Sequence, residues 1–151
     1  MTQRINYAKT ASAGIAALNR LQSYVDASGL EHSLLELVKT RASQINACAY
    51  CIDMHTKDAR AEGESEQRLY GLSAWREAPY YSDRERTALA WTEAVTALHG
   101  DIDDGIYQAL RAQFNEKEIV DLTLAVVTIN SWNRIAISFR VPPGRYKSRA
   151  K

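Results

Sequence analysis

The chain has 151 residues, the length of one ordinary domain or of one subunit in an oligomer. Hydrophobic residues make up 46% and charged residues 25%, a globular composition that excludes a disordered chain. Lys and Arg number 19 and Asp and Glu number 18, so the net charge of +1 gives no basis for expecting a nucleic-acid or membrane partner.

The sequence shows no targeting pattern and no membrane-spanning stretch. The small-residue run at 11–18 lacks an apolar core, and the longest apolar run, 122–129, is far shorter than the ~20 residues that a span needs. We therefore expect a cytoplasmic protein. A structural disulfide is rare in that compartment, so a close pair of cysteines there indicates redox chemistry or a metal.

Helical periodicity dominates the chain, and we expect an all-α, compact helical bundle that forms a single domain over 1–151. Ser82 with Glu85, and Asn115 with Glu118, have the spacing of a capping box at a helix start. The predicted helices cover 11–27, 31–45, 48–62, 66–70, 73–77, 82–98, 103–114 and 116–139. The last ten residues, 142–151, form a basic tail, and 145–151 should be solvated and partly disordered.

Both cysteines of the chain lie in Cys48-Ala49-Tyr50-Cys51, four residues before His55. Residues three and four apart share a helix face, so the two thiols are neighbours and His55 lies beside Cys51. The free N–H groups at a helix N-terminus stabilise a thiolate, and we expect them to lower the pKa of Cys51. A thiolate, a proton carrier and a second thiol are the parts that a peroxide-reducing site needs.

Glu36 joins this group through the predicted turn. If the helices before and after Ile45-Asn46-Ala47 fold back on each other, residues whose numbers sum to about 91 lie level, and Glu36 faces His55. A carboxylate there orients the imidazole and favours its protonated form, so that the imidazole serves Cys51 directly or through a water.

The pattern of Glu36, eleven residues, Cys48-Ala49-Tyr50-Cys51, three residues and His55 resembles the alkylhydroperoxidase D group of the carboxymuconolactone decarboxylase-like superfamily. The segments 41–46, 88–95 and 129–134 also resemble that group, so the likeness spans about 30–140. The resemblance implies an all-helical fold and a trimer or hexamer. It identifies Cys51 as the peroxide-attacking sulfur, Cys48 as proton donor and disulfide partner, and Glu36 with His55 as a proton relay.

The resemblance also implies a thiol-dependent peroxidase for antioxidant defence, acting on hydrogen peroxide or organic hydroperoxides without a cofactor or metal. The thiol reductant that recycles it is a dihydrolipoamide-, thioredoxin- or peroxiredoxin-linked system. The sequence departs from some members at Tyr50, where they carry a second histidine between the cysteines.

Three alternatives stay open on the sequence alone. The cysteines are competent zinc ligands together with His55 and Glu36, although no second Cys or His pair lies elsewhere in the chain. A redox sensor without turnover needs the same thiols. A decarboxylase-like enzyme needs Glu36 and His55 for proton transfer while the cysteines are incidental. Trp132, Asn133 and Arg134 either border the site or pack structurally.

Overall fold

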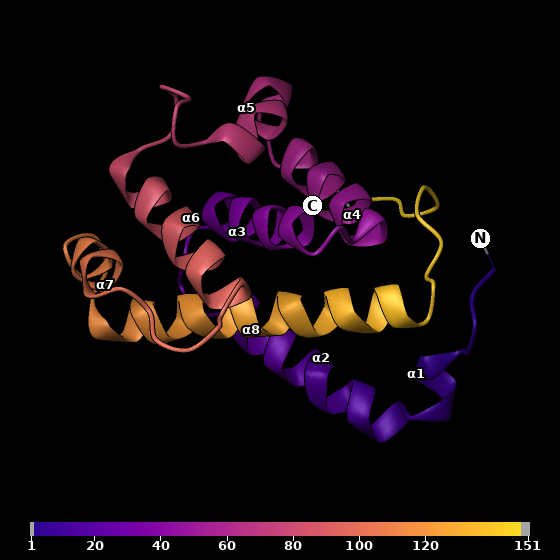
Figure 1. Ribbon diagram of the computed structural model, residues 1–151. Coiled ribbons are helices and arrows are strands. Elements are labelled where there is room, and N and C mark those ends of the chain that lie inside the picture. Colours follow the sequence, from indigo (N-terminus) through magenta and orange to yellow (C-terminus); the bar gives the residue numbers. More distant parts are fainter. Residues whose placement is uncertain (1, 149–151) are drawn as a thin grey trace.

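The computed structural model describes residues 2–148 and confirms an all-α bundle (Figure 1). No strand occurs within this described part of the chain. None of its helices is both long enough and apolar enough to cross a membrane. The helices are α1 Tyr7–Thr10, α2 Ser12–Asp26, α3 His32–Ile45, α4 Ala49–Ala61, α5 Glu66–Gly71, the 3-10 turn η1 Leu72–Ala74, α6 Asp83–Thr96, α7 Asp104–Arg111 and α8 Glu116–Ser138.

Helix α3 is the centre of the bundle, packed against α4, α6 and α8 (Figure 1). Its apolar side chains Leu35, Leu37 and Val38 are completely buried, and they face different parts of the core because α3 is covered on several sides. A helix buried all round also buries its polar residues, and Glu36 and Lys39 of α3 are each only 6% exposed. The packing thus brings charged groups into the interior.

The predicted turn between the second and third helices is confirmed. Ala47 adopts a left-handed backbone (φ 54°), and the Cys48 N–H donates to the Ser43 carbonyl at 2.9 Å. Asn46 closes α3 and donates its side-chain amide to two asparagines of α8, Asn130 and Asn133. The turn is therefore tied to the longest helix, and α3 and α4 form an antiparallel hairpin.

Helix boundaries follow the expected caps with a few corrections. The capping boxes at Ser82 and Asn115 are both present, at the starts of α6 and α8. The chain before α2 contains the short helix α1, which the sequence pattern did not predict. The predicted helix at 73–77 is wrong, because that segment forms only the 3-10 turn η1 followed by irregular turns. The predicted helix at 103–114 is shorter, since α7 ends at Arg111.

The expectation of a solvated C-terminal tail holds only in part for its described residues, because Arg145 and Lys147 are exposed whereas Tyr146 and Ser148 are partly buried. After α8 the chain crosses over α4, the helix that begins beside the cysteines (Figure 1). The Gly144 N–H donates to Asp53 at 3.0 Å, and Lys57 donates to the Tyr146 carbonyl at 3.1 Å. We call residues 142–148 the strap. The rest of the predicted tail, 149–151, lies outside the described residues.

Candidate active site

A cavity of about 810 Å³ opens along α4. Helices α2, α3, α4 and α8 supply most of its wall, and α1 and the strap complete it. Three of the four predicted site residues line it, namely Glu36, Cys51 and His55. Aromatic side chains contribute much of the remaining wall, from Tyr7, Tyr50, Trp132 and Tyr146. The cavity is thus large enough for a small organic molecule and has polar groups at one side.

The two cysteines are free thiols whose sulfur atoms lie 2.7 Å apart. Cys48 is the N-cap of α4 and Cys51 lies in its first turn, so both sulfurs are at the positive end of the helix. Each residue is 1% exposed. Only Cys51 of the two lines the cavity. A small oxidant in the cavity therefore meets Cys51 first, with Cys48 directly behind it.

The expected lowering of the Cys51 pKa is wrong, because within the thiol pair the lowered pKa falls on Cys48. The hydrogen bond between the two sulfurs lowers the pKa of Cys48 to about 7, against the effect of burial. The same bond raises the pKa of Cys51, and burial and the charge on Cys48 add to this. After one of two thiols in contact has lost its proton, the remaining proton is shared by both sulfurs, so the pair forms a single thiolate readily and a second one only with difficulty.

The predicted contact between Glu36 and His55 is confirmed. His55 Nδ1 lies 2.9 Å from Glu36 Oε2, with both side chains less than 10% exposed. Burial disfavours the charged carboxyl, but the hydrogen bonds and charges of His55 and Lys39 outweigh it, so the pKa of Glu36 is lowered. We call Glu36 and His55 the relay. The other ring nitrogen of His55, Nε2, has no hydrogen-bond partner among residues 2–148.

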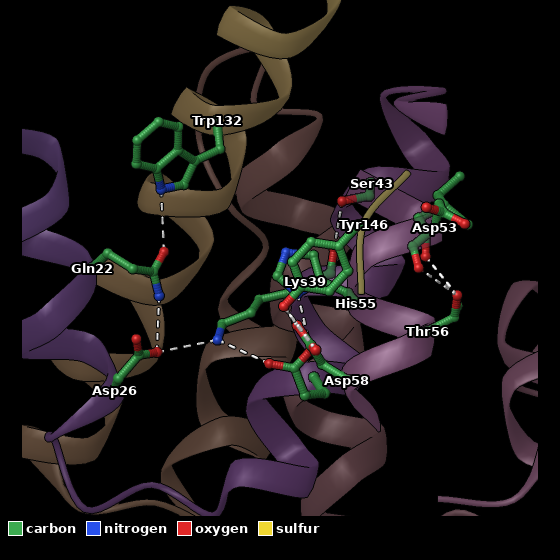
Figure 2. Close-up of polar contacts among 12 residues, drawn as sticks. Gln22, Asp26, Lys39, Ser43, Asp53, His55, Thr56, Asp58, Trp132 and Tyr146 are labelled. Atoms are coloured by element: carbon green, nitrogen blue, oxygen red, sulfur yellow. Dashed lines mark hydrogen bonds and ion pairs between the residues drawn. The ribbon is translucent and has the colours of Figure 1, made fainter. Parts of the chain in front are cut away.

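Lys39 is a charged residue of the site that the sequence analysis did not single out. Its ammonium lies 3.0 Å from Glu36 Oε1 and 3.2 Å from Asp26 Oδ1, and Figure 2 shows it reaching between α2 and α3. The signal in the sequence was its place one turn after Glu36. That spacing predicts an ordinary surface ion pair, and the burial of α3 makes it an interior one.

Of the three residues left open in 132–134, Trp132 lines the cavity, Arg134 is exposed and does not line it, and Asn133 lies behind the sulfurs. Its side chain is completely buried and donates to Ser43 Oγ at 3.0 Å while accepting from Asn46 Nδ2 at 2.8 Å. The same amide also acts on the sulfurs, because its hydrogen bond contributes to lowering the pKa of both Cys48 and Cys51. Asn133 therefore supports the charged form of the thiol pair from the α8 side.

Asp58 and Tyr146 form the outer side of the site. The Tyr146 hydroxyl lies 2.9 Å from each Asp58 oxygen, and Figure 2 shows the ring above Asp58 and His55. Burial, followed by this bond to Asp58, raises the pKa of Tyr146 to about 12. The strap thus covers one side of the relay with a hydroxyl that stays protonated at neutral pH.

The geometry gives limited support to a metal. Among the described residues, Glu36, His55 and Asp58 offer ligand atoms within 4.8 Å of one another, and neither sulfur belongs to this group. The Cys–Cys–His–Glu zinc site considered from the sequence is therefore not assembled. The Lys39 ammonium, 3.0 Å from Glu36, also opposes a cation there by charge repulsion.

Comparison with known proteins identifies the family. The profile of the carboxymuconolactone decarboxylase family matches residues 13–94. The uncharacterized protein YdfG of Bacillus subtilis (strain 168) is 42% identical over 139 residues, which cover 91% of this chain and 95% of YdfG.

Two solved structures share the fold. ATU0492 from Agrobacterium tumefaciens, a protein of unknown function named as a putative antioxidant defence protein AhpD, superposes with a TM-score of 0.92 at 45% identity, covering 96% of this chain and 100% of that one. An uncharacterized peroxidase-related protein from Silicibacter sp. TM1040 has a TM-score of 0.78 at 25% identity, covering 86% and 70%. The chain belongs to the carboxymuconolactone decarboxylase family and is an alkylhydroperoxidase D-like member of it.

Proposed function

We propose that the protein is a thiol-dependent peroxidase that reduces hydrogen peroxide or organic hydroperoxides through a sulfenic acid and disulfide cycle. The observation that carries the proposal is the pair of sulfurs 2.7 Å apart, one of them on a cavity wall that also holds the relay. The likeness to a putative antioxidant defence protein at 45% identity supports the same chemistry.

The first half of the cycle uses Cys51, since this sulfur lines the cavity. The thiol pair has lost one proton near neutral pH, and the remaining proton moves across the sulfur–sulfur contact to Cys48. The Cys51 thiolate attacks the terminal peroxide oxygen, the O–O bond breaks, and the sulfur becomes a sulfenic acid. The leaving alkoxide or hydroxide takes a proton from Cys48 or from the relay and departs as alcohol or water.

The second half forms the disulfide. The Cys48 thiolate attacks the Cys51 sulfenic acid, and the displaced hydroxide is protonated to water. An external dithiol then reduces the disulfide and restores the thiol pair. We propose a dihydrolipoamide-, thioredoxin- or peroxiredoxin-linked system as this reductant, by the resemblance to the alkylhydroperoxidase D group.

Substitution of each cysteine separates the roles. Cys51→Ser should abolish peroxide consumption, whereas Cys48→Ser should permit one turnover and then stop at the sulfenic acid, which a dimedone probe traps. The assay is peroxide consumption with a panel of reductants that includes dihydrolipoamide, thioredoxin and glutathione. Full turnover by Cys51→Ser contradicts the proposal, and activity on another substrate in the double Cys→Ser variant favours a decarboxylase-like reaction.

We also propose that the protein acts as a homo-oligomer, a trimer or hexamer. Three branched aliphatic side chains of α8 are exposed, Val120 at 57%, Val127 at 44% and Ile137 at 46%. Apolar groups along one long helix are typical of a subunit interface. Native mass spectrometry gives the subunit count, and a monomer at micromolar concentration contradicts this part of the proposal.

A further inference from the structure

Lys39 is almost completely buried although its side chain carries a charge. The residue is 6% exposed, and its ammonium lies between Glu36 on its own helix and Asp26 at the end of α2 (Figure 2). A lysine is rarely buried unless it is paired, because removing an ammonium from water is costly. The buried ammonium therefore calls for a functional explanation that offsets the cost of removing it from water.

The ammonium is held in place by a series of polar contacts along the cavity wall. Asp26 accepts from Gln22 at 2.9 Å as well as from Lys39, and Gln22 accepts from the Trp132 indole N–H at 3.2 Å. Figure 2 shows this series running from α8 through α2 to α3. This series of contacts ends at the relay, because one oxygen of Glu36 contacts the Lys39 ammonium and the other contacts His55.

A carboxyl beside an imidazole has two proton arrangements. In one, a carboxylate accepts a hydrogen bond from Nδ1–H, and Nε2 of His55 keeps a lone pair that can accept a proton. In the other, which holds one proton more, taken up by Glu36, a carboxylic acid donates to Nδ1, and Nε2 carries the ring hydrogen and cannot accept another. Only the first arrangement lets His55 take a proton from a thiol.

The ammonium discriminates between these arrangements. It has donors only, so the Glu36 oxygen that it contacts must accept, and its charge at 3.0 Å favours the carboxylate strongly in a site shielded from water. We propose that Lys39 is a positioning residue of the relay, whose ammonium keeps Glu36 ionised and thereby holds His55 in the Nδ1–H tautomer with Nε2 free to accept a proton. The link to Cys51 chemistry rests on the proposed peroxidase function, whereas the tautomer itself does not.

Other titratable groups face the relay from the elements around it. Asp26 of α2 shares Lys39, Asp58 of α4 places an oxygen within 4.8 Å of Glu36 and His55, and Tyr146 of the strap donates to Asp58. Cys51 lies on the same cavity wall. The carboxylates outnumber the ammonium in this cluster, so removal of Lys39 leaves excess negative charge and raises the proton affinity of every group in it.

The test uses Lys39→Met, which keeps an unbranched side chain only one atom shorter and removes its charge. Long-range ¹H–¹⁵N NMR reports the tautomer of each histidine, and the chain has three, so the spectrum of His55→Gln identifies the His55 signal. We expect the Nδ1–H tautomer in the wild type and in Lys39→Arg, and the Nε2–H tautomer or a mixture in Lys39→Met. An Nε2–H tautomer in the wild type overturns the inference, whatever the stability of the variants.

Thiol alkylation gives a second readout that needs no peroxide. The rate with iodoacetamide at pH 7 should fall by about tenfold in Lys39→Met, with its pH profile moved up by about one unit, and should recover in Lys39→Arg. Lys117→Met is the matched control, because Lys117 pairs with Asp121 on α8 and neither residue lines the cavity. Equal profiles for folded Lys39→Met and the wild type overturn the inference.

The outcomes separate the two proposals. Lack of peroxidase activity in the wild type, together with the expected tautomer and alkylation results, contradicts the peroxidase function and leaves the role of Lys39 intact. Normal peroxidase activity together with an unchanged His55 tautomer in Lys39→Met contradicts the role of Lys39 and leaves the function intact.

Discussion

Asn133 offers a direct way to perturb the thiol pair from a helix that carries no cysteine. Its amide donates to Ser43 and supports the charge on both sulfurs, while its oxygen accepts from Asn46. The substitution Asn133→Asp keeps the shape of the side chain and the accepting oxygen. It replaces the donor with a second acceptor and adds a negative charge beside the sulfurs.

The magnitude follows from burial. The Asn133 side chain is 0% exposed, so water does not replace the lost donor. Two lost hydrogen bonds and a buried charge without a partner should together cost about 3–5 kcal/mol of unfolding free energy. A negative charge in contact with the thiols should raise their pKa by about one unit or more, which slows alkylation at pH 7 by at least ~10-fold.

Asn130→Asp is the matched control on the same helix. Asn130 also accepts from Asn46, at 2.9 Å, but it lies one turn earlier and accepts from Arg134 at 2.8 Å, so a charge there has a cationic partner. Urea unfolding and the iodoacetamide rate–pH profile measure the two effects. If Asn133→Asp and Asn130→Asp give the same profile, the reasoning about the Asn133 amide is refuted.

Three further predictions concern ionisation, the relay and the strap. Thiolate absorbance at 240 nm should rise by one thiolate with a midpoint near pH 7, as Cys48 ionises, and by the second thiolate only at far higher pH. A single step in which both thiolates form together contradicts the sharing of a proton between the two sulfurs. Glu36→Gln removes the charged partner of the imidazole and should slow alkylation near neutral pH, and a rate–pH profile identical to wild type counts against it. Tyr146→Phe removes the bond to Asp58, worth ~1 kcal/mol, and should speed amide hydrogen exchange across 142–148 by up to about tenfold; unchanged exchange contradicts the anchoring role.

The sequence predicted the hairpin and its pairing because both are local. Helical periodicity, the break at Asn46 and a count along two helices are enough to place Glu36 opposite His55, and the contact is 2.9 Å. The capping boxes at Ser82 and Asn115 were predictable for the same reason, since each is read within four residues. Local sequence patterns were therefore enough to predict most helices and the turn before Cys48.

The remaining parts of the site depend on long-range packing. Asn133 meets Ser43 across 90 positions in the chain, and Tyr146 meets Asp58 across 88. No periodicity relates such residues, so the basic tail predicted the exposure of Arg145 and Lys147 but not the place of Tyr146 on the cavity wall. Lys39 was not singled out because the sequence alone does not show that α3 is covered on several sides.

The ionisation of the thiols could not be predicted from helix position alone. A single cysteine in the first turn of α4 would have its thiolate favoured by the helix end. The contact of 2.7 Å changes this, because the two sulfurs titrate as a pair in which the lowered pKa falls on Cys48 and not on Cys51. The side-chain geometry, which the sequence does not contain, decides between Cys48 and Cys51.

The most direct measurement is the redox state of the two sulfurs after one equivalent of cumene hydroperoxide, followed by non-reducing peptide mass spectrometry. The wild type should lose two hydrogens and yield a Cys48–Cys51 linked peptide, while Cys48→Ser should gain one oxygen on Cys51. Free thiols in the wild type after the peroxide has been consumed, or oxygen found on Cys48 with Cys51 unchanged, would contradict the account.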